Sequence, residues 1–388
     1  MLNKFIILIF LLCFSVTSQA ANKWPSEAQT ELVKQRQANF PWQNIVAAVD
    51  WYSPLEQVPG ATNPAPLPEA LNENDKYTAA EKLVAQYNSY ALLIWQNGAL
   101  RYERYWPGFS QQSRYDTASM HKTVVALLVG AALADGKITS LTQPVSDFLT
   151  NVKPTALGNA PLRSLLEMSS GIGGPAFSSE ATSVGMQTFL GDDLKQAYQH
   201  WPMEHGLNAE FHYSNANPQY LSWVIEQATG LRYADYLSQR LWQPLGASDA
   251  RVWLDHEQGS ARTSCCLQAS ARDWLRIGLL IMNEGRVGDK QIIPAKFIRD
   301  MVSPSALNPN YGWQIWRGSP HNPNRKYSRN SPFSVPAKQP FNADDVYYLD
   351  GSGAQRVYIV PSQQTVIVRI GQPSQDWDDA ALPNLILK

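Results

Sequence analysis

The segment ASMHKTVVALLVGAALA, residues 118–134, decides how this chain folds. After Lys122 its side chains are apolar almost all round, which is typical of a helix buried in the protein interior. Asp135 and Gly136 follow and end the pattern. The segment therefore predicts a central, buried helix with Ser119 and Lys122 in its first turn.

Ser119 and Lys122 can act together because residues three apart on a helix lie on the same face. A serine hydroxyl becomes a good nucleophile when a base takes its proton, and burial can lower the pKa of a lysine enough for this task. Backbone N–H groups at a helix start favour developing negative charge. Alone, Ser-x-x-Lys is a weak signal, since roughly one such pair is expected by chance.

A second polar motif, Tyr213-Ser214-Asn215, precedes a helix predicted over Pro218–Gly230. A phenol close to a serine and a lysine can pass a proton to a leaving group. The Asn215 amide can hold either Lys122 or a substrate carbonyl. Taken alone, the motif is better explained by a buried tyrosine at a helix start.

A third segment, Asp350-Gly351-Ser352-Gly353, lies between two predicted strands. Glycines at a strand edge let a substrate come close to the backbone and leave an N–H for an oxyanion. By itself the segment is an ordinary turn. The three segments in this order are much harder to explain by chance.

The ordered set resembles the motifs of the serine β-lactamase and penicillin-binding-protein superfamily, on the class C side, where tyrosine heads the second motif. The resemblance covers residues 80–375 and implies an α+β fold, in which helices flank an antiparallel β-sheet and an all-helical subdomain is inserted. Further segments are similar to the family pattern: Trp95–Gly98, Tyr102–Tyr105, Leu165–Gly171, Pro244–Gly246 and Ser270–Trp274.

One position departs from that pattern. β-Lactamases and peptidases of the superfamily carry a lysine, sometimes a histidine, in a Lys-Thr-Gly motif that binds the substrate carboxylate. Alignment on Gly351 puts Leu349 at the lysine position, and alignment on Gly353 offers Ser352 for the threonine but still no lysine. The chain thus looks more like 6-aminohexanoate-dimer hydrolases and family VIII esterases.

The resemblance implies cleavage of an amide or ester through an acyl-enzyme. Ser119 would be the nucleophile, Lys122 the general base and Tyr213 the general acid, with the backbone N–H groups of Ser119 and Ser352 holding the oxyanion. The remaining predicted site residues bind substrate or orient the catalytic pair: Asn215, Gly351 and Gly353.

Two other functions stay open. One is a β-lactamase or D-alanyl-D-alanine peptidase acting on peptidoglycan, and the other is a non-catalytic binding or sensor module. The expected partner is a small-molecule amide or ester, and no cofactor or metal is implied. Among the scattered histidines, His121 points away from its neighbours and is expected to pack, whereas His212 could support Tyr213.

The remaining patterns predict one sheet built from both ends of the chain. Asn97-Gly98 suits a type I′ turn between two strands. The predicted strands are Tyr90–Gln96, Ala99–Trp106, Tyr311–Arg317, Val346–Asp350, Gln355–Val360 and Thr365–Ile370. Further helices are predicted over Ala79–Asn88 and Ala269–Asn283, and a mostly helical subdomain over 137–255. The hydrolase domain is expected to cover 76–375, with a C-terminal tail at 376–388.

Two segments are expected to be irregular. Residues 21–75 are predicted to form an arm rather than part of the core. Within it, five prolines fall in fifteen positions, from Pro54 to Pro68, and exclude regular structure in that stretch. Gly318–Phe341 is predicted to be a long loop. Its basic side chains are most simply solvated surface and could alternatively recognise an anion: Arg325, Lys326 and Arg329.

The composition is that of a globular protein, with 388 residues, 44% of them hydrophobic, and a formal net charge of −1. Without a basic surplus, binding of nucleic acid is not expected. Residues 1–20 have the layout of a secretory signal peptide cleaved after Ala20. Their apolar run is too short to span a bilayer. A periplasmic or extracellular protein without stable membrane insertion is predicted.

Two cysteines, Cys265 and Cys266, remain after cleavage and are neighbours. An oxidising compartment would permit a disulfide between them. The ring would be small and strained, so we interpret the pair as buried thiols.

Overall fold

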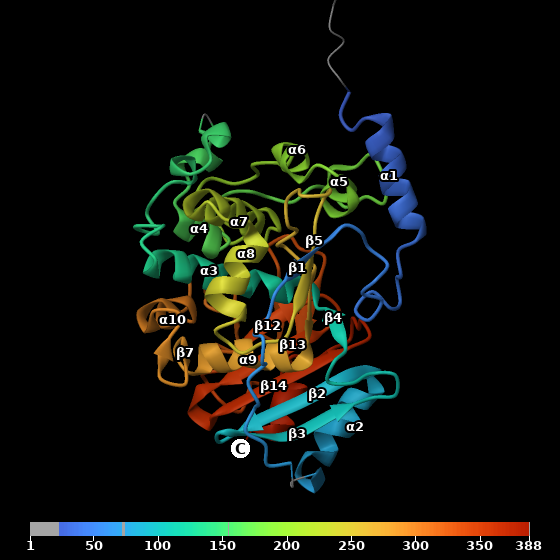
Figure 1. The fold of residues 1–388 in the computed structure, drawn as a ribbon, viewed down its shortest axis with the longest axis vertical. Helices are drawn as coiled ribbons and strands as arrows, with labels where there is room; N and C mark the ends of the chain where they lie inside the picture. Colours follow the sequence, from blue (N-terminus) through green and yellow to red (C-terminus); the bar gives the residue numbers. More distant parts are fainter. Residues whose placement is uncertain (1–22, 72–73, 154, 388) are drawn as a thin grey trace, which may run out of the picture.

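This computed structural model describes residues 23–71, 74–153 and 155–387 (Figure 1). The predicted signal peptide, residues 1–20, lies outside the described residues. Within the described ranges, no helix is both long and apolar enough to cross a membrane.

Six antiparallel strands form the main sheet, in the order β3-β2-β14-β13-β12-β9 (Figure 1). Their bounds are β2 (Ser89–Gln96), β3 (Ala99–Tyr105), β9 (Trp316–Arg317), β12 (Tyr347–Gly351), β13 (Gln355–Val360) and β14 (Thr365–Gly371). The two ends of the chain meet where β14 pairs with β2, with Val368 opposite Leu93. This confirms the prediction of one sheet assembled from both ends.

Positive φ angles account for one correct and one wrong prediction in this sheet. Asn97 and Gly98 have φ values of 48° and 81°, as a type I′ turn requires. The strand predicted over Tyr311–Arg317 is wrong except for its last two residues. Gln314 adopts a φ of 55°, which interrupts the extended backbone, and Tyr311 instead bridges back to Trp316.

Both faces of the sheet are buried by alternate side chains. Leu92 and Ile94 belong to the core shared with α2 (Thr78–Gln86) and α11 (Ala381–Ile386), whereas Leu93 belongs to the core on the side of α9 (Ala271–Met282). Residues 376–388, predicted as a tail, contain α11 and contribute Trp377 and Leu382 to the first of these cores.

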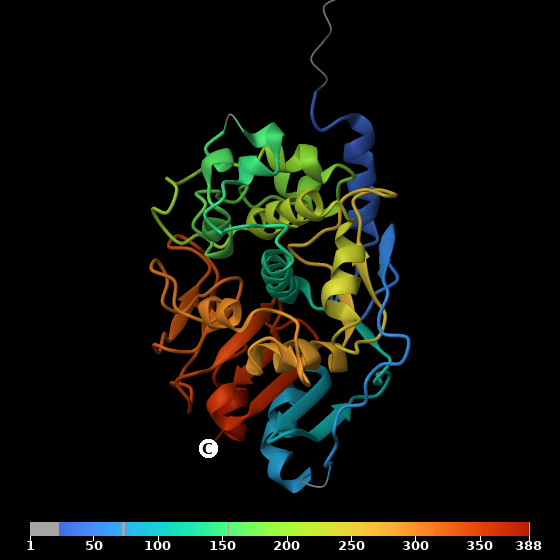
Figure 2. The ribbon, with the colours of Figure 1, turned by 60° about the vertical axis from the view of Figure 1, so that its left-hand side comes forward.

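A helical region lies on the far side of α3 (His121–Ala134) from the sheet, and Figure 2 shows α3 between the two. Its helices are α4 (Leu162–Leu166), α5 (Val184–Leu190), α6 (Leu194–Gln199) and α7 (Ala216–Thr229). The next helix, α8 (Tyr233–Leu237), lies beside α3 and runs into a π-helical turn, Ser238–Trp242, that packs against α3 (Figure 2). The side chains of α3 are buried from His121 to Leu128 and beyond, and α7 packs against it. Gly230 ends α7 with a φ of 71°. The predicted buried helix and helical insertion are both confirmed.

A second sheet has the order β1-β5-β6-β4. Its strands are β1 (Leu55–Val58), β4 (Arg114–Asp116), β5 (Ala250–Trp253) and β6 (Leu267–Ser270). The expectation that the stretch from Pro54 to Pro68 lacks regular structure is wrong, because it contains β1. The predicted arm also contains a helix, α1 (Glu27–Ala38). Ser26 caps α1, and β1 is an edge strand lying between Pro54 and Pro59, a position where flanking prolines are tolerated.

The long segment Gly318–Phe341 contains a small hairpin rather than only loop. The remaining elements are α10 (Ala295–Met301), β7 (Arg286–Val287), β8 (Lys290–Gln291), β10 (Asn324–Lys326) and β11 (Ser334–Pro336). Arg325 on β10 is 3% exposed, so the interpretation of this residue as solvated surface is wrong. Its guanidinium is buried because two aspartates, Asp350 and Asp379, lie against it.

Candidate active site

Ser119 lies on a constrained turn between β4 and α3. Ala118, just before it, has a φ of 51°, a conformation that costs a non-glycine residue about 1–3 kcal/mol and is concentrated at functional sites. Asp116 holds the turn, since its Oδ1 accepts a hydrogen bond from the Ala118 N–H at 3.1 Å. A short 3₁₀ helix, Ala118–Met120, then leads into α3 and leaves Ser119 partly exposed.

Lys122 is buried at 1% exposure, and its Nζ lies 2.6 Å from Ser119 Oγ. The same Nζ lies 2.5 Å from the carbonyl oxygen of Ser264. Burial lowers the pKa of Lys122 to about 7, and the charge of Asp350 opposes this shift. A large share of the molecules therefore carries the neutral amine near neutral pH, as a base for Ser119 must.

Tyr213 completes this group from a distant part of the chain. Lys122 Nζ lies 5.0 Å from the centre of its ring. Burial, followed by the charge of Asp350, raises the pKa of Tyr213 well above its ordinary value, while a hydrogen bond with the Ser119 side chain acts in the opposite direction. The phenol therefore keeps its proton at neutral pH.

The position of Tyr213 is fixed by backbone and ring contacts. Its N–H donates to the Tyr327 carbonyl at 2.8 Å. Its ring packs against three aromatic rings, those of Tyr311, Trp316 and Tyr327. Tyr327, which directly follows β10, therefore helps to hold the Tyr213 phenol beside Ser119.

Asn215 does not meet Lys122 in the way one predicted alternative required. It stands at the start of α7 and is exposed, and its backbone carbonyl accepts a hydrogen bond from the Tyr198 hydroxyl at 3.3 Å. The buried amide of this turn belongs to Asn217, whose Oδ1 accepts from Ser170 Oγ at 2.5 Å. The exposure of Asn215 is compatible with the other alternative, contact with a substrate carbonyl.

The third motif lies against the turn that carries Ser119. A Cβ at Gly351 would lie 2.1 Å from the Thr117 carbonyl oxygen, so a side chain at this position would force β12 away from the turn. Gly353 has a φ of 73°, which favours glycine, and Ser352 between the two glycines is exposed. The structure therefore places this backbone beside Ser119.

The position of the missing lysine offers no positive charge on β12. Leu349 is fully buried, and Asp350 is 5% exposed. Asp350 belongs to a closed ring of alternating charges, which comprises Arg325, Asp350, Arg356 and Asp379 and is called the ion ring below. Burial would raise the pKa of Asp350, but the two arginines outweigh this effect and hold the pKa below its ordinary value. The Arg325 guanidinium is thus buried and paired with Asp350 and Asp379, so it does not bind an external anion.

The Ser264 carbonyl, which no side-chain motif reveals, precedes a disulfide between Cys265 and Cys266. The interpretation of this pair as free thiols is wrong. The chain turns sharply here, with Cys266 at a φ of 75°, and residue types alone do not show that turn.

His121 packs against this turn, with Nδ1 2.5 Å from the Cys265 carbonyl oxygen and Nε2 2.8 Å from the Tyr233 hydroxyl. Burial lowers the pKa of His121 to about 4, and its predicted packing role is confirmed.

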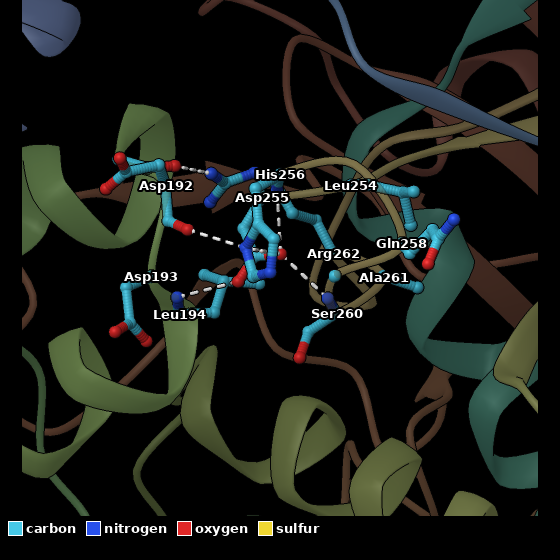
Figure 3. A network of polar contacts seen from close by, with 12 residues as sticks. Asp192, Asp193, Leu194, Leu254, Asp255, His256, Gln258, Ser260, Ala261 and Arg262 are labelled. Carbon is cyan, nitrogen blue, oxygen red and sulfur yellow. Dashed lines mark hydrogen bonds and ion pairs between the residues drawn. The ribbon is translucent and has the colours of Figure 1, made fainter.

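A buried polar network fixes the segment that leads to Ser264 (Figure 3). Asp255 is 1% exposed and accepts hydrogen bonds from three backbone N–H groups, those of Leu194, His256 and Ser260. Arg262 donates to two backbone carbonyls, those of Thr188 and Gly191. The segment is thereby tied to the helices α5 and α6, so the Ser264 carbonyl stands at a defined place above Lys122.

Comparisons with known proteins identify relatives of this chain and of its fold. The chain is 25% identical over 224 residues to the 6-aminohexanoate-dimer hydrolase of Paenarthrobacter ureafaciens, a match that spans 55% of this chain and 57% of that relative. The structure is similar to that of a presumed 6-aminohexanoate-dimer hydrolase from Bacillus anthracis, with a TM-score of 0.71, 23% identity and coverage of 88% of this chain and 89% of the other.

A D-alanine carboxypeptidase, AmpC from Burkholderia cenocepacia, has the same fold, with a TM-score of 0.59, 17% identity and coverage of 81% of this chain and 99% of the other. The family model described as Beta-lactamase matches residues 78–386, which contain all three motifs. This chain therefore belongs to the β-lactamase family.

Proposed function

We propose that this protein is a serine hydrolase that cleaves amide or ester bonds through an acyl-enzyme on Ser119. The observation that carries the proposal is the 2.6 Å separation of Lys122 Nζ and Ser119 Oγ, with the lysine buried and its pKa lowered to about 7. A neutral amine at hydrogen-bond distance from a hydroxyl is the arrangement that general-base activation of a nucleophile needs.

In the first half-reaction Lys122 Nζ takes the Ser119 proton while Oγ bonds to the substrate carbonyl carbon. The backbone N–H groups of Ser119 and Ser352 hold the resulting oxyanion. The bond from carbon to the leaving nitrogen or oxygen then breaks, and the leaving group receives a proton through the Tyr213 phenol. The Ser264 carbonyl orients the lysine amine throughout.

In the second half-reaction a water molecule takes the place of the leaving group. The neutral Lys122 amine accepts a proton from this water, relayed by the Tyr213 phenol, which gives up its own proton as it receives the water's, while the water oxygen attacks the acyl carbon. The bond from that carbon to Ser119 Oγ then breaks, Oγ takes the proton back from Lys122, and the acid is released. The exposed Asn215 amide is placed to bind the substrate carbonyl or its neighbouring amide.

The substrate class follows from the lack of a cation on β12, because Leu349 cannot bind a carboxylate as a lysine does. A β-lactam holds its carboxylate on the carbon next to the scissile nitrogen, where the lysine would meet it, whereas the carboxylate of a 6-aminohexanoate dimer lies five methylene groups from the amide nitrogen. We therefore favour a linear amide of the 6-aminohexanoate-dimer type, or a short-chain ester, over a β-lactam. The similarity to 6-aminohexanoate-dimer hydrolases supports this choice.

A substrate panel tests this choice directly. The purified protein is assayed with 6-aminohexanoate dimer, p-nitrophenyl acetate and butyrate, and nitrocefin. Turnover of the dimer or the esters is expected, with kcat/KM for nitrocefin lower by roughly 100-fold or more, since that substrate's carboxylate finds no partner. Rapid nitrocefin hydrolysis without cleavage of dimer or esters would contradict the proposal and favour a β-lactamase.

The activity is expected to rise with pH through a single ionisation near pH 7. Lys122 must be neutral to take a proton, and burial sets its pKa at about 7, so kcat/KM falls about tenfold for each pH unit well below that value. His121 does not contribute in this window, because its pKa is lowered to about 4. Initial rates from about pH 5.5 to 8.5, with circular dichroism at each pH to follow folding, measure the profile. A flat profile, or one that falls as pH rises, would exclude Lys122 as the base.

Residues 1–20 are proposed to direct export, which places the mature enzyme in the periplasm or outside the cell. The disulfide between Cys265 and Cys266 supports this location, because disulfides persist in oxidising compartments.

A further inference from the structure

A cluster of ionisable side chains lies beside the active site without a part in the proposed hydrolysis. Ligand atoms of Glu204, His205 and His212 all lie within 4.8 Å of one another. His205 Nε2 is 3.2 Å from His212 Nδ1 and 3.5 Å from Glu204 Oε2, and the last two atoms are 4.0 Å apart. Glu210 adds a second carboxylate, with Oε1 3.1 Å from His205 Nε2.

The backbone brings these side chains together. The N–H groups of Glu204 and His205 both donate to the Gly171 carbonyl, at 3.0 and 3.2 Å, and the His212 N–H donates to the Met168 carbonyl at 2.8 Å. Both ends of the loop 204–212 are thus hydrogen-bonded to the short segment 168–171, which follows α4. The cluster is therefore held on a fixed frame rather than on a free loop.

The same frame leaves room for the carboxylate. A Cβ at Gly173 would lie 2.1 Å from the Glu204 Cδ atom, so the Glu204 carboxyl group rests directly against Gly173 and would have to move if this residue carried a side chain. His205 and His212 are partly buried, whereas Glu204 is 36% exposed. The cluster is therefore open to solvent on the side of Glu204, which gives an ion a path of entry.

The three distances from His205 Nε2 are close to the edges of a small coordination polyhedron, and the fourth, 4.0 Å between His212 Nδ1 and Glu204 Oε2, is longer. A tetrahedral zinc ion with bonds of about 2.0–2.1 Å places its ligand atoms about 3.3 Å apart. The contacts of His205 Nε2 with His212, Glu204 and Glu210 are 3.2, 3.5 and 3.1 Å. Two facing imidazole nitrogens can share one proton at most, whereas a cation satisfies the lone pairs of both and the charge of the carboxylates.

We propose that Glu204, His205 and His212 bind a divalent transition-metal ion such as Zn²⁺, with Glu210 closing the site after a side-chain rotation. Imidazole ligands favour zinc and its neighbours over magnesium and calcium, which prefer all-oxygen sites. The ion would hold the loop 204–212 directly before Tyr213. The site is independent of the proposed hydrolysis, which needs no metal.

Isothermal titration calorimetry of the chelator-treated protein, purified without a histidine tag, tests the site. We expect one equivalent of Zn²⁺ with a dissociation constant on the order of 10 µM or tighter, and no comparable binding of Mg²⁺. His205→Ala is expected to weaken Zn²⁺ binding roughly tenfold or more. His200→Ala is the matched control, an exposed histidine outside the cluster, and is expected to bind like the unaltered protein.

A second variant, Glu204→Gln, and the absorption of bound Co²⁺ distinguish loss of the metal site from loss of folding. Glu204→Gln retains the size of a partly exposed side chain, so it tests the site even if His205→Ala folds poorly by circular dichroism. Co²⁺ absorption bands of a nitrogen- and oxygen-bound ion are expected in the unaltered protein and not in either variant. Absence of Zn²⁺ binding, or equal binding by the protein and both folded variants, would overturn the proposal. Neither readout depends on hydrolytic activity.

Discussion

Ser119→Ala is expected to lower kcat/KM for the best amide or ester substrate roughly 10⁴-fold or more, and Lys122→Ala is expected to do the same. Without the hydroxyl there is no nucleophile, and without the amine nothing at 2.6 Å takes its proton. Residues that act as one unit fail together, so the double variant should be no slower than either single variant. Steady-state rates of the three variants measure the effect.

A covalent probe separates loss of chemistry from loss of folding. A fluorophosphonate should add its mass to Ser119 in the unaltered protein and to neither Ser119→Ala nor Lys122→Ala, while circular dichroism shows all of them folded. Ser303→Ala removes an exposed hydroxyl beside α10 and should react normally. Lack of an adduct in the unaltered protein, or retention of turnover by Ser119→Ala, would contradict the mechanism and favour the sensor alternative.

The part of the site that could be predicted from the sequence is the part that depends on local geometry or on the family resemblance. Helical periodicity alone places Ser119 and Lys122 on one face. Tyr213 could be connected to them only through the resemblance, because about ninety residues separate the two segments. The Ser264 carbonyl could not be predicted, since every residue type supplies a carbonyl and only the fold selects one.

The fold shows the same division. The strands from Gln355 to Ile370 and the turn at Asn97-Gly98 were predictable because alternation and positive φ preference are local properties. The edge strand β1 was not, since its pairing with β5 joins segments nearly two hundred residues apart. Arg325 looked like a surface residue for the same reason. Its ion-pair partners are Asp350 and Asp379, and the sequence alone does not show which carboxylates will lie beside a given arginine.

Asp379→Ala is expected to lower the free energy of unfolding by about 3–5 kcal/mol, since removing one member of a buried ion group leaves its partners uncompensated. Asp379 accepts from Arg325 Nε at 2.8 Å and lies 2.9 Å from Arg356 Nη2. Both arginines are at most 3% exposed, so neither guanidinium can recover the lost contact from water. The remaining Asp350 then faces two positive charges alone. Denaturant unfolding at neutral pH measures the change.

The exposed Asp376→Ala is the matched control and should change stability by less than about 0.5 kcal/mol. The pH dependence gives an independent check on the cause. The arginines hold the pKa of Asp350 below its ordinary value, so the stability contributed by the ion ring is complete above about pH 4 and is lost as the pH falls through the lowered pKa. The gap in unfolding free energy between the unaltered protein and Asp350→Asn, which lacks this carboxylate, should therefore narrow in acid. A gap between the unaltered protein and Asp350→Asn that keeps a constant size down to the acid transition would show that lost packing, and not the charge of the ion ring, causes the destabilisation.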